Sequence, residues 1–262
     1  MNLRCPICQD ELTLDAACAT CPQHHTFDRA REGYWNLLPA QHKKSANPGD
    51  SKAMLQARKR FLEAGFYQPL IDELRTRIIG GTLLDLGCGE GYYARSLGAA
   101  SGIDISKDGV RLAAKADKTG VYTVGSAYRL PYLDDQFNHV LCVFSPIDLD
   151  EVQRVLKPGG QLHWVGPAPA HLNQLAAMVY DEVQTHQATP PESLKGLPRT
   201  SLKFDMQMDG PILADLLCMT PYYWSADEAK QTAIARAPNT QVTASFEVLS
   251  CSLAAASSNA SN

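Results

Sequence analysis

Between residues 80 and 170 the chain alternates short apolar runs with stretches of helical periodicity. The apolar runs cover residues 82–87, 100–105, 121–125, 139–144 and 161–166. The helical stretches cover residues 91–97, 109–118 and 149–156. This alternation predicts an α/β fold in which buried strands, joined by helices, form a doubly wound and mostly parallel sheet. A further apolar run at residues 246–253 predicts a late strand of the same sheet.

The residues before position 80 follow a different pattern. Residues 1–35 are rich in Cys and His and are too few to form a core of their own. Residues 36–50 contain Pro and Gly and read as a linker, after which Ser51 predicts the N-cap of a helix over 52–64 that Gly65 ends. A second short helix is expected after Pro69. We therefore divide the chain into 1–35, 36–80, 81–253 and a Ser- and Asn-rich tail, 254–262, that we expect to fray.

The cysteines near the N-terminus have the spacing of a metal site. Cys5 and Cys8 form one pair, and Cys21 and His25 form another after 12 intervening residues. Zinc prefers four such ligands in a tetrahedron, and each pair can reach the ion from one tight turn. Cys18 and His24 offer alternative ligands that the spacing alone does not separate from the others. Four protein ligands make a closed site, so we expect a structural Zn²⁺.

Residues 83–91 form a glycine-rich turn between a predicted strand and a predicted helix. Gly87, Gly89 and Gly91 allow close approach of a ligand to the backbone, and the helix N-terminus offers free N–H groups. The spacing Gly-x-Gly-x-Gly differs from the Gly-x-Gly-x-x-Gly of dinucleotide enzymes. Asp85 would repel a pyrophosphate, whereas it suits a ligand that carries an ammonium and a sulfonium, as S-adenosylmethionine (SAM) does.

Three further motifs follow in order along the chain. Asp104 ends the second apolar run, where an acid can accept both ribose hydroxyls. Ser126 and Ala127 follow the third run and suit the adenine edge, and residues 154–160 turn a helix into the fifth run. A single glycine turn is common, but the ordered set of four resembles the class I methyltransferase fold, which implies SAM as the cofactor.

Runs outside these motifs resemble the RlmA family, the 23S ribosomal RNA guanine-N1 methyltransferases. They lie at residues 21–25, 27–28, 32–34, 36–39, 41–45, 48–51, 57–58, 61–62, 67–70, 85–93, 166–167, 171–172 and 219–221. The resemblance implies a seven-stranded class I sheet behind a small N-terminal zinc ribbon. It also implies transfer of a methyl group from SAM to N1 of a guanine in a 23S rRNA hairpin.

The resemblance assigns roles to particular residues. It implies that zinc is held by Cys5, Cys8, Cys21 and His25, which leaves Cys18 outside the site. It adds Tyr67, the Gly89–Glu90 region and His171 to the residues that hold SAM. It further implies that the protein is a homodimer whose partner is 23S rRNA.

The charge of the chain is uneven. The net charge is −4, but residues 1–80 carry 11 Lys and Arg against 9 Asp and Glu. Residues 42–60 form a basic stretch with one acid, Asp50, and are predicted to contact RNA phosphates. Its cations are Lys43, Lys44, Lys52, Arg58, Lys59 and Arg60. A solvated helix face is the simpler alternative for this stretch.

The loop after the fourth run holds the candidate catalytic residues. Phe144 is predicted to stack on an extruded guanine, because an N1 inside a base pair cannot be reached. Ser145 could relay the N1 proton through water, and we assign no general base. Ser126, Asn138 and Ser145 depart from residues common at these positions in class I enzymes.

The sequence contains no run approaching the roughly 18 apolar residues of a membrane span. The start Met-Asn-Leu-Arg-Cys-Pro lacks an apolar leader, so we expect a cytoplasmic protein that does not enter membranes. Two other functions compete with rRNA methylation: methylation of a small molecule, and RNA binding without catalysis by a protein that holds SAM.

Overall fold

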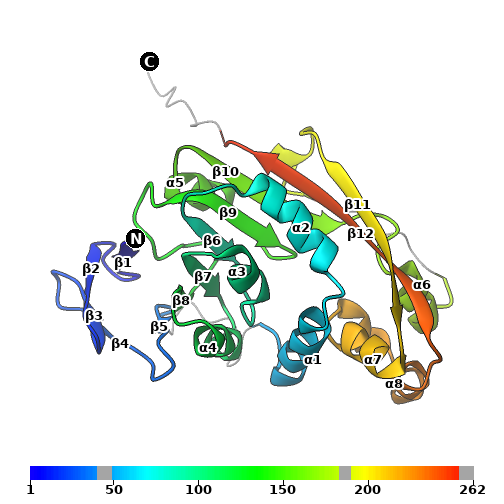
Figure 1. The fold of residues 1–262 in the computed structure, drawn as a ribbon. Helices are drawn as coiled ribbons and strands as arrows, with labels where there is room; N and C mark the ends of the chain where they lie inside the picture. The colour runs from blue at the N-terminus through cyan, green and yellow to red at the C-terminus, as the bar shows by residue number, and fades with distance from the viewer. Residues whose placement is uncertain (40–48, 183–189, 254–262) are drawn as a thin grey trace.

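The computed structural model describes residues 1–39, 49–182 and 190–253. Within these ranges the chain forms a small antiparallel sheet at the N-terminus and a large sheet with helices on both faces (Figure 1). Lys43 and Lys44 of the predicted RNA-binding set and the predicted frayed tail lie outside the described residues. None of the helices within the described ranges is long and apolar enough to cross a membrane.

The small sheet consists of four short strands in sequential order. They are β1 (Leu3–Arg4), β2 (Glu11–Leu14), β3 (Cys18–Thr20) and β4 (Thr26–Asp28). Strands this short bury little apolar area, and the small sheet also packs against the rest of the chain. Leu3 is fully buried and bridges to Tyr132, and the Arg4 N–H donates to the Pro131 carbonyl at 3.0 Å.

The large sheet has the strand order β11-β12-β10-β9-β6-β7-β8-β5. Its central strands are β6 (Leu83–Leu86), β7 (Ser101–Asp104), β8 (Val121–Val124), β9 (Phe137–Val143) and β10 (Leu156–Pro167). These five are mutually parallel and confirm the five predicted strands. β12 (Thr240–Cys251) pairs antiparallel with β10 and with β11 (Thr200–Met208).

The number of strands differs from the prediction. The large sheet has eight strands and not seven, because β5 (Trp35–Asn36), which follows the small sheet in the chain, pairs parallel with β8. Two residues of β5 give no periodicity that could have been recognised in the sequence. The expected boundary of the zinc ribbon at residue 35 therefore falls inside a strand of the large sheet.

Helices cover both faces of this sheet. They are α1 (Lys52–Glu63), α2 (Gln68–Arg77), α3 (Tyr92–Leu97), α4 (Lys107–Ala116), α5 (Leu149–Val155), α6 (Asn173–Val179), α7 (Gly210–Cys218) and α8 (Glu228–Ala235), with 3-10 turns η2 (Glu192–Leu194) and η3 (Pro221–Ser225). Ser51 Oγ accepts the Met54 N–H at 3.3 Å, which confirms the predicted N-cap of α1.

Alternate residues of each central strand enter two different hydrophobic clusters. Leu141 and Val143 pack with α2, α3 and α4 in one cluster, whereas Val140 and Cys142 pack with α5 and the small sheet in the other. This alternation is expected of a strand buried on both faces. Because β6, β7, β8 and β9 are parallel, their carboxyl ends meet at one edge of the sheet. Ligands bind at this edge in open α/β sheets.

Candidate active site and metal centre

Four side chains of the small sheet converge on one point. Sγ of Cys5, Cys8 and Cys21 and a ring nitrogen of His25 all lie within 4.8 Å of one another. Individual separations are 3.7 Å for Cys5 Sγ–His25 Nδ1, 3.5 Å for Cys8 Sγ–Cys21 Sγ and 3.4 Å for Cys21 Sγ–His25 Nδ1. A zinc tetrahedron with bonds of about 2.0–2.3 Å has edges of about 3.5–3.8 Å. The four ligands therefore fit a closed, structural Zn²⁺ site.

The alternative ligands lie elsewhere. Cys18 Sγ is 3.2 Å from Asp15 Oδ2 and 3.8 Å from Thr20 Oγ1, and it is not part of the cluster. His24 is exposed and has a left-handed φ of 62° that turns the chain between Cys21 and His25. The geometry thus agrees with the ligand set that the resemblance implied.

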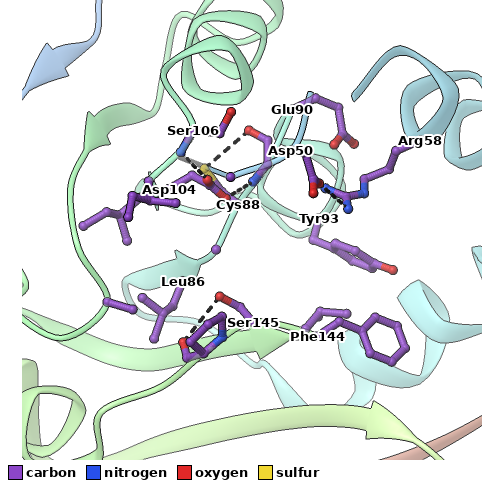
Figure 2. Close-up of a pocket in the computed structure, with 18 of the residues that line it drawn as sticks. Asp50, Arg58, Leu86, Cys88, Glu90, Tyr93, Asp104, Ser106, Phe144 and Ser145 are labelled. Atoms are coloured by element: carbon purple, nitrogen blue, oxygen red, sulfur yellow. Dashed lines mark hydrogen bonds and ion pairs between the residues drawn. The ribbon is translucent and has the colours of Figure 1, made fainter. Parts of the chain in front are cut away.

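A cavity of about 330 Å³ opens at the carboxyl edge of the large sheet. Seven of the ten predicted cofactor residues line it: Tyr67, Gly87, Gly89, Glu90, Asp104, Ser126 and Ala127. They come from the start of α2, the turn after β6, the end of β7 and the loop after β8. The fold therefore brings motifs that are distant in sequence to one cavity, which is drawn in Figure 2.

The glycine turn packs closely against Ser145 and Ala113. Gly87 has a φ of 81°, and a Cβ atom there would lie 2.1 Å from Ser145 Oγ. Gly91 has a φ of 84°, and a Cβ atom there would lie 2.7 Å from the Cβ of Ala113 on α4. Both positions need glycine for conformation and for space. Gly91 thus supports the turn and does not line the cavity.

Asp104 is fixed by backbone donors at the end of β7. Its Oδ2 accepts the Gly89 N–H at 2.9 Å and its Oδ1 accepts the Ser106 N–H at 2.7 Å. Burial raises the pKa of Asp104, and these two hydrogen bonds oppose that rise. The carboxylate is therefore held at the cavity wall, where a ribose could donate to its remaining lone pairs.

Two other buried carboxyl groups each have one oxygen without a hydrogen-bond partner among the described residues. Asp85 is 1% exposed and Glu90 is 2% exposed, and Asp85 Oδ2 and Glu90 Oε1 have no hydrogen-bond partner among the described residues. Burial raises the pKa of Asp85 to about 8, with the negative charge of Glu90 adding to the rise. Buried polar atoms without partners are costly, so they favour a ligand that brings positive groups. Of these two acids, Glu90 lines the first cavity, whereas Asp85 lines neither cavity. SAM carries two such positive groups, and the surroundings of Glu90 suit it.

A second cavity of about 870 Å³ adjoins the first. Tyr67, Phe144 and Ser145 line both cavities, and the second is also lined by Trp164 and Trp224. His171 lies in this second cavity and not in the first, with its Nδ1 2.9 Å from the Ser245 carbonyl oxygen. His171 does not line the cavity that suits SAM, so its contact with SAM stays a prediction.

Phe144 stands at the junction of the two cavities. It follows β9 with a φ of 52°, is 47% exposed, and its ring lies 5.6 Å from that of His171. Figure 2 shows Phe144 and Ser145 below the glycine turn and Arg58 with Asp50 above them. Asp50 and Trp224 are cavity residues to which the sequence assigned no role, although Asp50 lies in the run 48–51 that resembles the RlmA family.

The described cations of the basic stretch, at residues 52–60, lie in different surroundings. Lys52 is exposed, Lys59 is near Glu63 at 3.8 Å, and Arg60 pairs with Asp215 of α7. The Arg58 side chain lines both cavities and is only 26% exposed, so it is not part of the exposed face of α1. Adjacent positions on a helix face different directions, so a run of cations in sequence is not a patch in space.

The fold, the glycine turn and the metal cluster together define a class I SAM-dependent methyltransferase with an N-terminal zinc ribbon. Residues 3–46 match the family described as "RlmA, N-terminal", and residues 84–164 match the family described as "Methyltransferase domain". These matches confirm the predicted fold class, the zinc and the cofactor.

Two relatives are similar to this chain over most of their length. The 23S rRNA (guanine(748)-N(1))-methyltransferase of Streptomyces fradiae is 34% identical over 247 residues, covering 86% of each chain. YxjB of Bacillus subtilis, provisionally named a 23S rRNA (guanine-N(1)-)-methyltransferase, is 31% identical over 94% of this chain and 95% of its own. The chain belongs to this family of RlmA-type methyltransferases.

A small-molecule enzyme matches a smaller part of the chain. The demethylmenaquinone methyltransferase of Bacillus velezensis is 32% identical over 102 residues, which is 32% of this chain and 44% of that enzyme. The whole-length likeness is therefore to the zinc-ribbon family.

Proposed function

We propose that this enzyme transfers the methyl group of SAM to N1 of a guanine in a 23S rRNA hairpin. The observation that carries the proposal is the shared wall of the two cavities, formed by Phe144, Ser145 and Pro146. One cavity suits SAM, and the other is aromatic and open to solvent. A planar base in the second cavity would present its edge toward the first. The full-length relatives named for this reaction support the same substrate.

The residues of the chain act mainly by alignment. SAM supplies an electrophilic methyl group, and in-line displacement requires the acceptor nitrogen to be held on the axis of the breaking bond. The exposed Phe144 ring can stack on the base, and the Ser145 hydroxyl, 3.4 Å from the Pro146 carbonyl, can pass the N1 proton to water. An extruded base is required, because N1 is hidden within a pair.

The rim of the cleft suits unpaired nucleotides. Tyr128 is 62% exposed beside the first cavity and Trp224 is 72% exposed beside the second. Exposed aromatic rings serve as stacking platforms for bases in RNA loops. Lys52 and Lys59 of α1 remain proposed phosphate contacts, together with Lys43 and Lys44 and the zinc ribbon. The proposal implies that the enzyme is in the cytoplasm, where bacterial ribosomal RNA is made.

The direct test is methyl transfer from labelled SAM to 23S rRNA isolated from cells that lack this gene. We expect label in the RNA and 1-methylguanosine by nucleoside mass spectrometry. Unlabelled RNA, from a preparation that binds zinc and SAM, would refute the proposal. Turnover of a metabolite would then support the small-molecule function, and SAM binding without any product would support the non-catalytic one.

Two copies could grip one folded RNA between their clefts, so we also propose a homodimer. Sedimentation velocity should give twice the chain mass at micromolar concentration without RNA, and that mass plus one RNA hairpin when the hairpin is added. A species of single-chain mass that still methylates the RNA would refute the dimer and leave the reaction intact.

A further inference from the structure

Arg58 lies in an unusual position for a cation of a basic stretch. Its guanidinium reaches from α1 into the cleft, where it lines both cavities. Nη2 pairs with Asp50 Oδ2 at 2.5 Å, and Nη1 lies 3.2 Å from the point that a Cβ atom of Gly89 would occupy. Figure 2 shows the pair beside Glu90, on the side of the cavity opposite Ser145. One edge of the guanidinium is thus held by Asp50, and the other faces the glycine turn.

The charges around Arg58 keep it ionised. Burial would lower the pKa of Arg58, but Asp50, Glu90 and Asp104 together raise it above its ordinary value. Arg58 in turn opposes the rise that burial causes in the pKa of Glu90. Glu90 Oε1 has no partner among the described residues, although only 2% of the residue is exposed. A fixed cation and an unpartnered carboxyl group therefore line the same part of the cavity.

A zwitterion matches this arrangement. The methionine end of SAM carries a carboxylate and an ammonium on one carbon atom, and both must be desolvated when the cofactor enters a buried cleft. Charge-assisted hydrogen bonds to a planar guanidinium are the strongest that a carboxylate can receive in a protein.

We propose that Arg58 binds the carboxylate of the methionine moiety of SAM, while Glu90 accepts a hydrogen bond from its ammonium. Asp50 is a positioning residue that holds the guanidinium against the glycine turn. The inference rests on the dependence of the enzyme on SAM and not on the identity of the methyl acceptor.

An RNA phosphate is the competing ligand for Arg58. It would bring a negative charge among Asp50, Glu90 and Asp104 without supplying any positive group to compensate. SAM adds an ammonium and a sulfonium to the same acidic surroundings, so its net charge is complementary to them. The electrostatics consequently favour SAM over a phosphate at this position.

The test compares ligands that differ only at the methionine end. Isothermal titration calorimetry on the zinc-loaded protein would measure binding of SAM, S-adenosylhomocysteine and 5′-methylthioadenosine, which lacks the amino acid group. Losing one buried charged contact should weaken the first two by about 10- to 100-fold in Arg58→Ala. Binding of 5′-methylthioadenosine should change less than about twofold, which also shows that the variant folds.

Matched variants separate a contact from a change of charge. Lys115→Ala removes an exposed cation of α4 that lines neither cavity, and it should leave all three affinities unchanged. Arg58→Ala/Asp50→Ala keeps the net charge of the pocket and should show the same selective loss as Arg58→Ala. Asp50→Asn should show a smaller loss with the same dependence on ligand, because the guanidinium remains but is less well held.

Several outcomes would overturn the inference. Unchanged SAM affinity in Arg58→Ala, or an equal loss for all three ligands in a folded variant, would exclude a carboxylate contact. Weaker RNA binding with unaltered SAM binding would assign Arg58 to a phosphate. Arg58→Gln, which retains most of the side chain, decides between these outcomes if Arg58→Ala does not fold. Because no methyl acceptor is present, failure of the rRNA assay would not affect the result.

Discussion

Replacing Gly87 by Ala tests the account of the glycine turn most directly. The φ of 81° at Gly87 lies in the left-handed region, which costs an L-residue about 1–2 kcal/mol. The new Cβ atom would also lie 2.1 Å from Ser145 Oγ and 2.4 Å from Ser145 Cβ. Overpacking of this kind costs about 1–3 kcal/mol. We therefore expect Gly87→Ala to lower the free energy of unfolding by about 2–5 kcal/mol.

Two companion variants divide this cost into its parts. Gly98 also has a positive φ, 67°, but nothing lies within 4 Å of its added Cβ, so Gly98→Ala should show the conformational cost alone. Adding Ser145→Gly to Gly87→Ala removes both close atoms and leaves the nearest, Ser145 Cα, at 3.8 Å. The double variant should recover about 1–3 kcal/mol relative to additivity of the single changes.

Urea denaturation of the zinc-loaded protein, followed by circular dichroism, measures these three variants and Ser145→Gly alone. Recovery in the double variant would show that the turn is packed against the loop after β9. A Gly87→Ala variant no less stable than Gly98→Ala would refute the reasoning, as would a double variant that recovers nothing. Either result would mean that Ser145 moves freely away from the glycine turn.

Three further predictions concern the metal, the base and the buried acid. Cys21→Ser should lose zinc and unfold the small sheet, whereas Cys18→Ser should retain its zinc by elemental analysis; equal zinc content in both variants would disprove the ligand set. Phe144→Ala should reduce kcat/KM for RNA by about 5- to 150-fold through lost stacking of about 1–3 kcal/mol, with a smaller loss of SAM affinity, and full activity would exclude stacking. The native state keeps a proton on Asp85 up to a pKa of about 8, whereas the unfolded chain releases it near the ordinary pKa of 3.8. The free energy of unfolding should therefore fall as pH rises between these two values and then level. Asp85→Asn removes this contribution, so it should gain stability relative to the parent between pH 5.5 and 8.5 in urea melts, and parallel curves would contradict the shift.

The central strands and the motifs between them could be recognised from local patterns. Apolar runs, glycine spacing and the N-cap at Ser51 are properties of neighbouring residues, and the strands β6 to β10 confirmed them. β5 could not be recognised, because its two residues become a strand only through pairing with β8. The position of Arg58 in the cleft could not be recognised for a similar reason, since the direction of a side chain on α1 depends on what the helix packs against.

The sequence by itself determined the class of the protein. Spaced cysteines, a glycine turn after an apolar run and an acid at the end of the next run specify zinc and SAM through short-range chemistry. Only the tertiary structure decided which residues share a cavity. It excluded Cys18 from the metal cluster, placed His171 in the second cavity, and brought Asp50 and Arg58 to the glycine turn. These juxtapositions depend on how separate segments pack around the sheet, and packing is a property of the whole chain that no local pattern records.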